Sequence, residues 1–246
     1  MSNDKSPSPE ERLQQEFNRW ADDGEGAKME RHHLDITKKT MRRMDLRPGQ
    51  RVLDLGCGSG WATRLLARMV GKSPQGSRQV VGVDISDEMV RQARDTSKEF
   101  DNVTFVVGSA AQIPWEENFF DKVLSVESFY YYPDQDRALA ELFRVMAPHG
   151  RLFILINLYQ DNPYSLQWVP KLKVPVHVRS AAEYVELLKK HAFENVEYAQ
   201  IPDDTPTPEN YQTTSFHSLD DLKAFKRVGA LLLMASKLDM RNAARG

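Results

Sequence analysis

The order of apolar and polar residues changes character after residue 50. From there, short apolar runs alternate with segments in which apolar side chains recur at helical spacing. Because strands and helices alternate, we expect βαβ units that form a parallel sheet with helices on both faces. The runs predict strands over residues 51–54, 79–84, 103–108, 120–125 and 151–157, and the periodic segments predict helices over 61–70, 87–99 and 135–146.

The last third of the chain follows a different pattern. Residues 158–178 are irregular and contain prolines, a helix is predicted over 181–191, and strands are predicted over 195–201 and 229–237. Two final strands joined without a long helix pair antiparallel. The predicted fold is therefore a doubly wound α/β fold with a seven-stranded, mostly parallel sheet and an antiparallel last strand.

A helical cap is predicted ahead of this domain. Residues 8–11 (Ser-Pro-Glu-Glu) have the features of a helix start, with an N-cap, a first-turn proline and acidic side chains. Leu13, Phe17 and Trp20 follow at helical spacing, and a second helix is predicted over 27–44 after a glycine-containing break. We therefore divide the chain into a disordered tail (1–8), a helical cap (9–47) and the main domain (48–246).

Composition and charge argue against some classes of protein. The chain has 246 residues, a formal net charge of −2 and a pI of about 6.3, so it lacks the basic excess typical of nucleic-acid binders. Cys57 is the single cysteine, which rules out an intramolecular disulfide and is compatible with a reducing compartment. Apolar runs are too short for a membrane span, and the first residues do not resemble a signal peptide, so we expect a cytoplasmic location.

The first strand of the main domain runs into a glycine-rich loop. Gly56, Gly58 and Gly60 alternate with other residues just before the helix that begins at Trp61. Glycines allow a ligand to approach the backbone, and the helix N-terminus adds unpaired N–H donors. Asp84 ends the next strand, where a carboxylate can accept hydrogen bonds from both hydroxyls of an adenosine ribose. The alternative is that Asp84 only caps the following helix.

Two residues distinguish between the possible nucleotide ligands. The NAD fingerprint requires a third glycine at the position of Trp61, where it allows close packing of helix and strand. Asp54 would place a negative charge beside a pyrophosphate, whereas the same charge suits the ammonium group of a methionine moiety. The loop therefore favours S-adenosylmethionine (SAM) over NAD.

Together these segments resemble the class I SAM-dependent methyltransferases, in particular the ubiquinone/menaquinone-biosynthesis type that acts on small molecules. The resemblance covers roughly residues 51–156, with motifs at 52–60, 81–86, 108–114, 120–134 and 144–150. It implies SAM as cofactor, with the methionine part at Asp54, Gly56, Cys57, Gly58, Gly60 and Val126, the ribose at Asp84, and the adenine at Ile85, Met89, Ser109, Ala110 and Ala111. The family often carries an acidic residue where Ser109 stands.

The acceptor site is expected beside the methyl group. The segment after the fourth strand, 128–134, is rich in tyrosine, and Glu127, Tyr130 and Tyr131 are candidate substrate-binding residues, with Trp20 on a lid formed by the cap. The six histidines lack metal-ligand spacing, so we expect no metal. A small-molecule acceptor methylated by in-line displacement is the favoured function. A non-catalytic SAM-binding regulator and an RNA or protein methyltransferase are the alternatives, and the pattern identifies neither a catalytic residue nor an oligomeric state.

Overall fold

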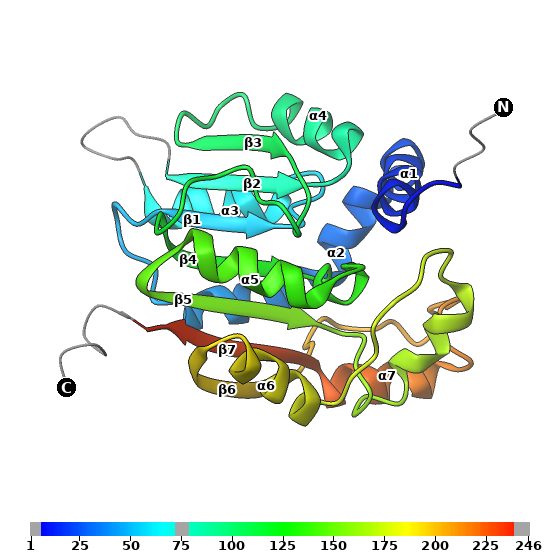
Figure 1. Ribbon diagram of the computed structural model, residues 1–246. Helices are drawn as coiled ribbons and strands as arrows, with labels where there is room; N and C mark the ends of the chain where they lie inside the picture. Colours follow the sequence, from blue (N-terminus) through cyan, green and yellow to red (C-terminus); the bar gives the residue numbers. More distant parts are fainter. Residues whose placement is uncertain (1–5, 72–78, 239–246) are drawn as a thin grey trace, which may run out of the picture.

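The computed structural model describes residues 6–71 and 79–238. A seven-stranded sheet forms its centre, with the strand order β3-β2-β1-β4-β5-β7-β6 (Figure 1). The strands are β1 (Val52–Leu55), β2 (Val80–Asp84), β3 (Val103–Val107), β4 (Phe120–Val126), β5 (Met146–Ile156), β6 (Phe193–Ile201) and β7 (Ala230–Lys237). The helices are α1 (Pro9–Asp22), α2 (Glu25–Arg43), α3 (Trp61–Val70), α4 (Asp87–Asp95), α5 (Gln135–Val145), α6 (Ala181–Lys190) and α7 (Leu219–Val228), with 3-10 turns η1 (Phe129–Tyr131) and η2 (Ser165–Lys171).

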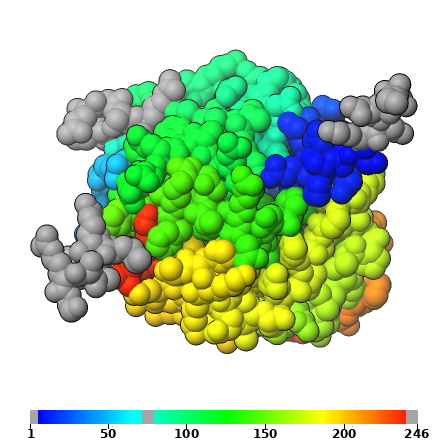
Figure 2. Space-filling view, in the orientation of Figure 1, coloured from blue at the N-terminus to red at the C-terminus, as the bar shows by residue number. Residues whose placement is uncertain are grey.

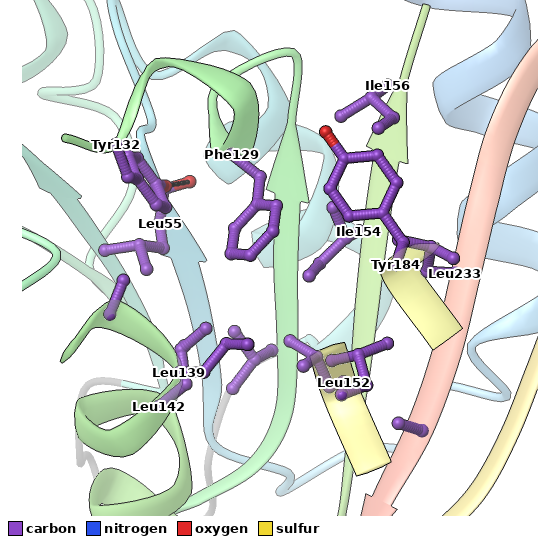
Figure 3. Close-up of a cluster of buried hydrophobic side chains, with 14 of the residues drawn as sticks. Leu55, Phe129, Tyr132, Leu139, Leu142, Leu152, Ile154, Ile156, Tyr184 and Leu233 are labelled. Atoms are coloured by element: carbon purple, nitrogen blue, oxygen red, sulfur yellow. Dashed lines mark hydrogen bonds between the residues drawn. The ribbon is translucent and has the colours of Figure 1, made fainter. Parts of the chain in front are cut away.

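Helices cover both faces of the sheet, because successive strand residues point to opposite sides. On β5, Leu152 and Ile154 face the core that α5 and α6 cover, whereas Phe153 faces the core that α2, α3 and α4 cover. Figure 3 shows the first of these cores, in which Leu139 of α5 and Tyr184 of α6 approach the sheet. The predicted doubly wound fold is confirmed.

The two final strands pair as predicted. β7 is antiparallel to both β5 and β6, and the strands from β3 to β5 are parallel to one another. One prediction was wrong: α7 lies between β6 and β7, where only a loop was expected. Its apolar residues Leu222 and Phe225 bury against Phe216 and the ring of Trp168, a small cluster built from two distant segments. The Ser218 cap, the acidic first turn and Gly229 after the last turn are local signals of this helix, which the apolar pattern alone does not reveal.

The N-terminal segment begins where its capping residues predict. The Ser8 hydroxyl accepts a hydrogen bond from the Glu11 amide, and the Glu11 carboxylate accepts one from the Ser8 amide. Ser8 is therefore the cap of α1 rather than part of a disordered tail, and residues 1–5 of that predicted tail lie outside the described residues. Figure 2 shows α1, in blue, against the green and yellow-green surface of the main domain.

The helix α2 begins earlier than predicted and belongs to a core of the sheet. It starts at Glu25, and Ile36 and Met41 are buried with side chains of α3 and of the sheet. The division of the chain at residue 47 stays a prediction. Among the described residues, no helix is both long and apolar enough to cross a membrane.

The strand order indicates at which end of the sheet a ligand binds. The chain moves outward from β1 to β2 and β3, then crosses back to β4 on the other side of β1. Loops leaving β1 and β4 therefore diverge, and such a switch point opens a crevice at the carboxyl ends of the strands. The glycine loop and the tyrosine-rich segment begin at these two strand ends.

Candidate active site

A cavity of about 350 Å³ lies at this end of the sheet. Its walls come from α1 and α2, the loops after β1, β2, β3 and β4, and η2. The sequence-predicted residues that line it are Trp20, Gly56, Cys57, Gly58, Asp84, Ile85, Met89, Ser109, Ala110, Ala111, Val126, Glu127, Tyr130 and Tyr131. Asp54 and Gly60 are the two predicted residues that do not line it.

The glycine loop is shaped by contacts with the segment after β4. Gly56 has φ +77°, and a Cβ there would lie 2.4 Å from the Ser128 side chain. That side chain occupies the space because its hydroxyl donates to the Leu55 carbonyl at 3.0 Å and bonds the Tyr132 hydroxyl at 2.9 Å. Gly58 also has positive φ, but a Cβ there would meet nothing within 4 Å. Its backbone therefore lies open to a ligand.

Asp84 connects the loop after β1 to the loop after β2. One carboxylate oxygen accepts a hydrogen bond from the Gly58 amide at 2.8 Å, and the other accepts one from the Ser86 amide at 2.9 Å. The hydroxyl of Ser86, rather than Asp84, caps α4 by accepting from the Met89 amide. Burial raises the pKa of Asp84 despite these amides. The carboxylate thus lines the cavity with lone pairs available for a ligand.

Asp54 lies beneath the glycine loop instead of in the cavity wall. It is 1% exposed, and its carboxylate accepts a hydrogen bond from the Thr63 hydroxyl at 2.6 Å. Burial raises the pKa of Asp54 to about 7, and the neighbouring charge of Asp84 adds to the effect. Asp54 therefore ties β1 to α3 and contributes negative potential from below.

Cys57 and Gly60 support the loop through packing. The Cys57 thiol lies toward Gly82 in the core, and burial raises its pKa well above the ordinary value. Such a thiol is a poor nucleophile, so only the backbone of Cys57 is suited to ligand binding. A Cβ at Gly60 would lie 2.7 Å from the Phe105 ring. Gly60 is thus required for close approach of the loop to β3.

Glu127 is a buried carboxyl group at the opposite side of the cavity. It has φ +54°, unusual for a residue with a side chain. The Asn157 amide donates to one of its oxygens at 2.6 Å and the Tyr130 hydroxyl to the other at 3.0 Å, while His33 Nε2 lies 3.8 Å away. Burial raises the pKa of Glu127 to about 8 and lowers that of His33 to about 4. At neutral pH, Glu127 is therefore mostly protonated and His33 is neutral.

Aromatic rings form the wall next to Glu127. Phe17 meets Tyr131 edge-on with a ring separation of 5.1 Å, and Trp20 meets Tyr131 at 6.3 Å. Tyr130 packs on Tyr131 at 4.5 Å. Edge-to-face contacts of this kind favour a defined arrangement of rings, so α1 is held over η1 by complementary shape as well as by burial.

Several lining residues escaped prediction from the sequence. Glu10 and His33 come from α1 and α2, and Trp168, Lys171 and Ser215 come from the C-terminal half. Their segments carry no motif, and only the fold brings them to the same cavity. Glu10 precedes Phe17 by two helical turns and Trp20 by nearly three, and this spacing is the one local signal that places it on the cavity side.

The electrostatics of the cavity suit a cationic ligand. Asp54, Asp84 and Glu127 all have raised pKa values, because burial leaves their negative forms without enough compensation. The ammonium and sulfonium charges of SAM would supply that compensation, and a pyrophosphate would worsen the imbalance. Among the described residues, no group of three or more side chains is arranged to hold a metal ion.

Known proteins agree with this geometry. A methyltransferase-domain family model matches residues 53–154. The methyltransferase in the solved complex with the Haloferax volcanii Trm112 methyltransferase activator is 31% identical, and the alignment covers 91% of this chain and 98% of that chain with a TM-score of 0.82. The chain belongs to the SAM-dependent methyltransferases. As an enzyme of this family, it uses SAM as cofactor, and the predicted resemblance is confirmed.

Two further proteins resemble this chain, one in sequence and one in fold. The ubiquinone/menaquinone biosynthesis C-methyltransferase UbiE of Psychromonas ingrahamii is 34% identical over 138 residues, which are 52% of this chain and 53% of that protein. The chain thus spans about half the length of the curated relatives it matches. Haemonchus contortus phosphoethanolamine N-methyltransferase 2, solved with S-adenosylhomocysteine, shares the fold at 20% identity and a TM-score of 0.63, over 82% of this chain and 52% of that one.

Proposed function

We propose that this methyltransferase acts on a small, largely apolar acceptor that binds in the cavity against the aromatic wall formed by α1 and η1. The observation that carries the proposal is the continuity of the cavity, which extends from Asp84 and Gly58 to the rings of Trp20 and Tyr131. Walls made mostly of aromatic and aliphatic side chains with a few polar groups are typical of small-molecule sites. The names of the UbiE-type relatives are consistent with such an acceptor.

The residues divide between the two ligands. SAM, when bound, supplies a methyl group activated by its sulfonium. The backbone of Gly56 and Gly58 cradles the methionine part, and Asp84 accepts hydrogen bonds from the ribose hydroxyls. Asp54 supports this half from below the loop through Thr63. These roles leave the Glu127 side of the cavity to the acceptor.

Glu127 takes the proton that the acceptor loses. Bound SAM would give its methyl group to the nucleophilic atom of the acceptor, with the electron pair of the broken carbon–sulfur bond left on sulfur, and the Glu127 carboxylate would take the proton that the acceptor loses. A sulfonium charge beside Glu127 lowers its pKa and generates that carboxylate. Tyr130 and the Asn157 amide hold its two oxygens in place. Exclusion of water by α1 strengthens these electrostatic effects.

A second candidate function is methylation of a macromolecule with the help of an activator protein. The observation that favours it is the Haloferax volcanii relative, which was solved together with the Trm112 activator. Under this alternative, α1 would have to move away to admit a side chain or a nucleotide. A chain with net charge −2 has less attraction for RNA than a basic one.

The experiment is a transfer assay with SAM labelled in its methyl group. The purified protein is incubated with lipid-extractable, aqueous small-molecule, protein and RNA fractions of cells that produce it. Label in a small-molecule fraction, lost in Glu127→Gln, supports the proposal. Label in the RNA or protein fraction, or label that appears only after a Trm112-type protein is added, supports the alternative and contradicts a small-molecule acceptor.

A further inference from the structure

The N-terminal lid helix contributes a carboxylate to the cofactor half of the cavity. Glu10 lies in the first turn of α1 and lines the cavity, together with Ile85, Met89 and Ser109. The Ser109 hydroxyl donates a hydrogen bond to Glu10 Oε1, and the same hydroxyl accepts one from the Ala111 amide at 3.0 Å. Glu10 therefore joins the loop after β3 to the lid.

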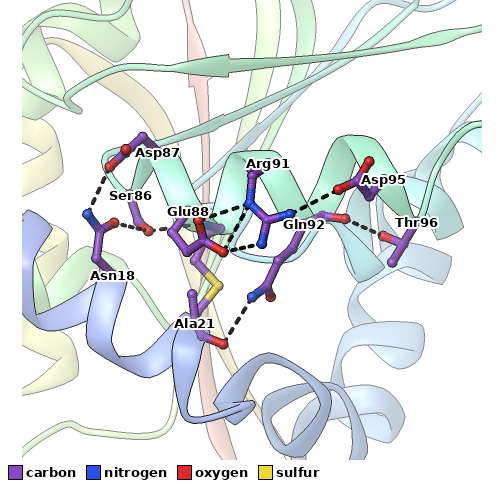
Figure 4. Close-up of polar contacts among 10 residues, drawn as sticks. Asn18, Ala21, Ser86, Asp87, Glu88, Arg91, Gln92, Asp95 and Thr96 are labelled. Carbon is purple, nitrogen blue, oxygen red and sulfur yellow. Dashed lines mark hydrogen bonds and ion pairs between the residues drawn. The ribbon is translucent and has the colours of Figure 1, made fainter.

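Polar contacts farther along α1 fix the position of this carboxylate. The Asn18 amide donates to Asp87 at 2.8 Å, and its carbonyl oxygen accepts from the Ser86 hydroxyl at 2.6 Å (Figure 4). The Gln92 side chain donates to the Ala21 carbonyl at 3.0 Å. These contacts dock α1 on α4, so that the first turn of α1 reaches the end of β3.

The hydrogen-bond donors and acceptors of Glu10 and Ser109 can be matched one by one. The hydroxyl of Ser109 has one hydrogen, which it gives to Glu10. Glu10 Oε2 accepts no hydrogen bond from any described residue. The Glu10 carboxylate thus keeps one free acceptor oxygen. The exocyclic amino group of adenine is a donor, whereas a carbonyl at the same position of a purine is an acceptor.

We propose that Glu10 recognises the adenine amino group of the cofactor, so that the lid helix completes the cofactor site. This inference rests on the proposed function, because it takes the adenine to lie between Ile85, Met89 and the segment 109–111. Glu10 then does two things: it selects adenine over a 6-oxo purine, and it lets the bound cofactor favour the docked position of α1.

The test compares two ligands that differ at position 6 of the base and in the proton that the 6-oxo base carries on N1. Binding of S-adenosylhomocysteine and of S-inosylhomocysteine, whose base carries a carbonyl in place of the amino group, is measured by calorimetry for the wild type, Glu10→Gln and Asp22→Asn. Asp22 is an exposed acid on the same helix and serves as the charge-matched control. Circular dichroism and melting curves verify that the variants fold.

We expect the wild type to prefer the adenosine ligand by about ten- to a hundred-fold, the effect of one hydrogen bond to a charged acceptor. In Glu10→Gln the preference falls to within about three-fold, because the new amide can donate to the inosine carbonyl. Asp22→Asn keeps the wild-type preference. The ratio of the two affinities is decisive, since a residue that only holds the lid would weaken both ligands equally.

Two outcomes would contradict the role of Glu10 and leave the proposed function untouched. One is a wild-type protein that binds both ligands equally well, and the other is a Glu10→Gln variant that keeps the full preference or loses affinity for both ligands in parallel. A wild-type protein that folds but binds neither ligand is a different result, because it contradicts the proposed function itself.

Discussion

At the scale of residues, the site is defined by carboxyl groups that burial has made costly to ionise. Asp84 and Glu127 line the cavity from opposite sides, and Asp54 lies under the loop between them. Burial raises the pKa of each of these carboxyl groups, and perturbed pKa values of this kind cluster at functional sites. A ligand with two positive charges is the natural complement.

Replacing Asp84 tests the ribose contact. Asp84→Ala is expected to weaken binding of SAM and of S-adenosylhomocysteine by about ten- to a thousand-fold, since hydrogen bonds to a charged group are lost. Asp95→Ala, on the exposed end of α4, is the control and should bind normally. Calorimetry measures both. An unchanged dissociation constant for Asp84→Ala would mean that Asp84 only ties Gly58 to Ser86.

Glu127 is expected to release a proton when the sulfonium of SAM binds beside it. With a pKa of about 8, it is mostly protonated in the ligand-free protein at pH 7. The sulfonium lowers that pKa, so SAM binding should release about one proton more than binding of the uncharged thioether S-adenosylhomocysteine. His33, with a pKa of about 4, is already neutral and adds nothing.

Calorimetry in buffers with different ionisation enthalpies measures that difference. Because both ligands carry the same ammonium and ribose, the subtraction removes the contributions of Asp54 and Asp84. In Glu127→Gln the difference should vanish, while in Asp54→Asn it should persist. Equal proton release for the two ligands in the wild type would show that Glu127 does not face the sulfonium.

At the scale of elements, the sequence predicts those helix starts and loops that neighbouring residues determine. The start of α1 follows from the Ser8 cap, and the glycine loop follows from a strand that ends in alternating glycines. The helix α7 was missed because Leu222 and Phe225 find their partners only in the segment around Trp168. Glu10 and His33 were missed for the same reason: their roles depend on where α1 and α2 dock.

The lid can be tested by shortening the chain. Removal of residues 1–23 deletes α1, which contributes Phe17, Trp20 and Glu10 to the cavity. We expect a folded domain that binds SAM more weakly and no longer transfers methyl groups, because the acceptor wall and the cover over the site are both gone. Circular dichroism, calorimetry and the transfer assay follow the three properties.

A shorter deletion, of residues 1–7, provides the control for that experiment. It leaves the Ser8 cap and all of α1 in place, so folding, SAM binding and transfer should match the full chain. Undiminished transfer by the protein that lacks residues 1–23 would show that α1 is not a lid. Unfolding of that protein would show instead that Leu13 and Ala21, the buried residues of α1, are required for the core.

At the scale of the whole molecule, the sheet provides a general SAM platform, and we expect the covering segments to determine which acceptor binds. The family match is confined to residues 53–154, which contain β2 to β4 and most of β1 and β5. The aromatic lining of the cavity is divided: Tyr130 and Tyr131 of η1 lie within that range, whereas Phe17 and Trp20 of α1 and Trp168 of η2 lie outside it. A shared fold therefore identifies the cofactor, while the acceptor has to be inferred from the cavity itself.

The measurement that most directly tests the central claim is calorimetric titration of the full chain with SAM and with NAD. A cavity built from Gly56, Gly58 and Asp84, with Trp61 where the NAD fingerprint needs glycine, should bind SAM and leave NAD unbound. The account predicts saturable binding of SAM that Asp84→Ala weakens, and no heat from NAD. Tight binding of NAD by a folded protein that ignores SAM would contradict it.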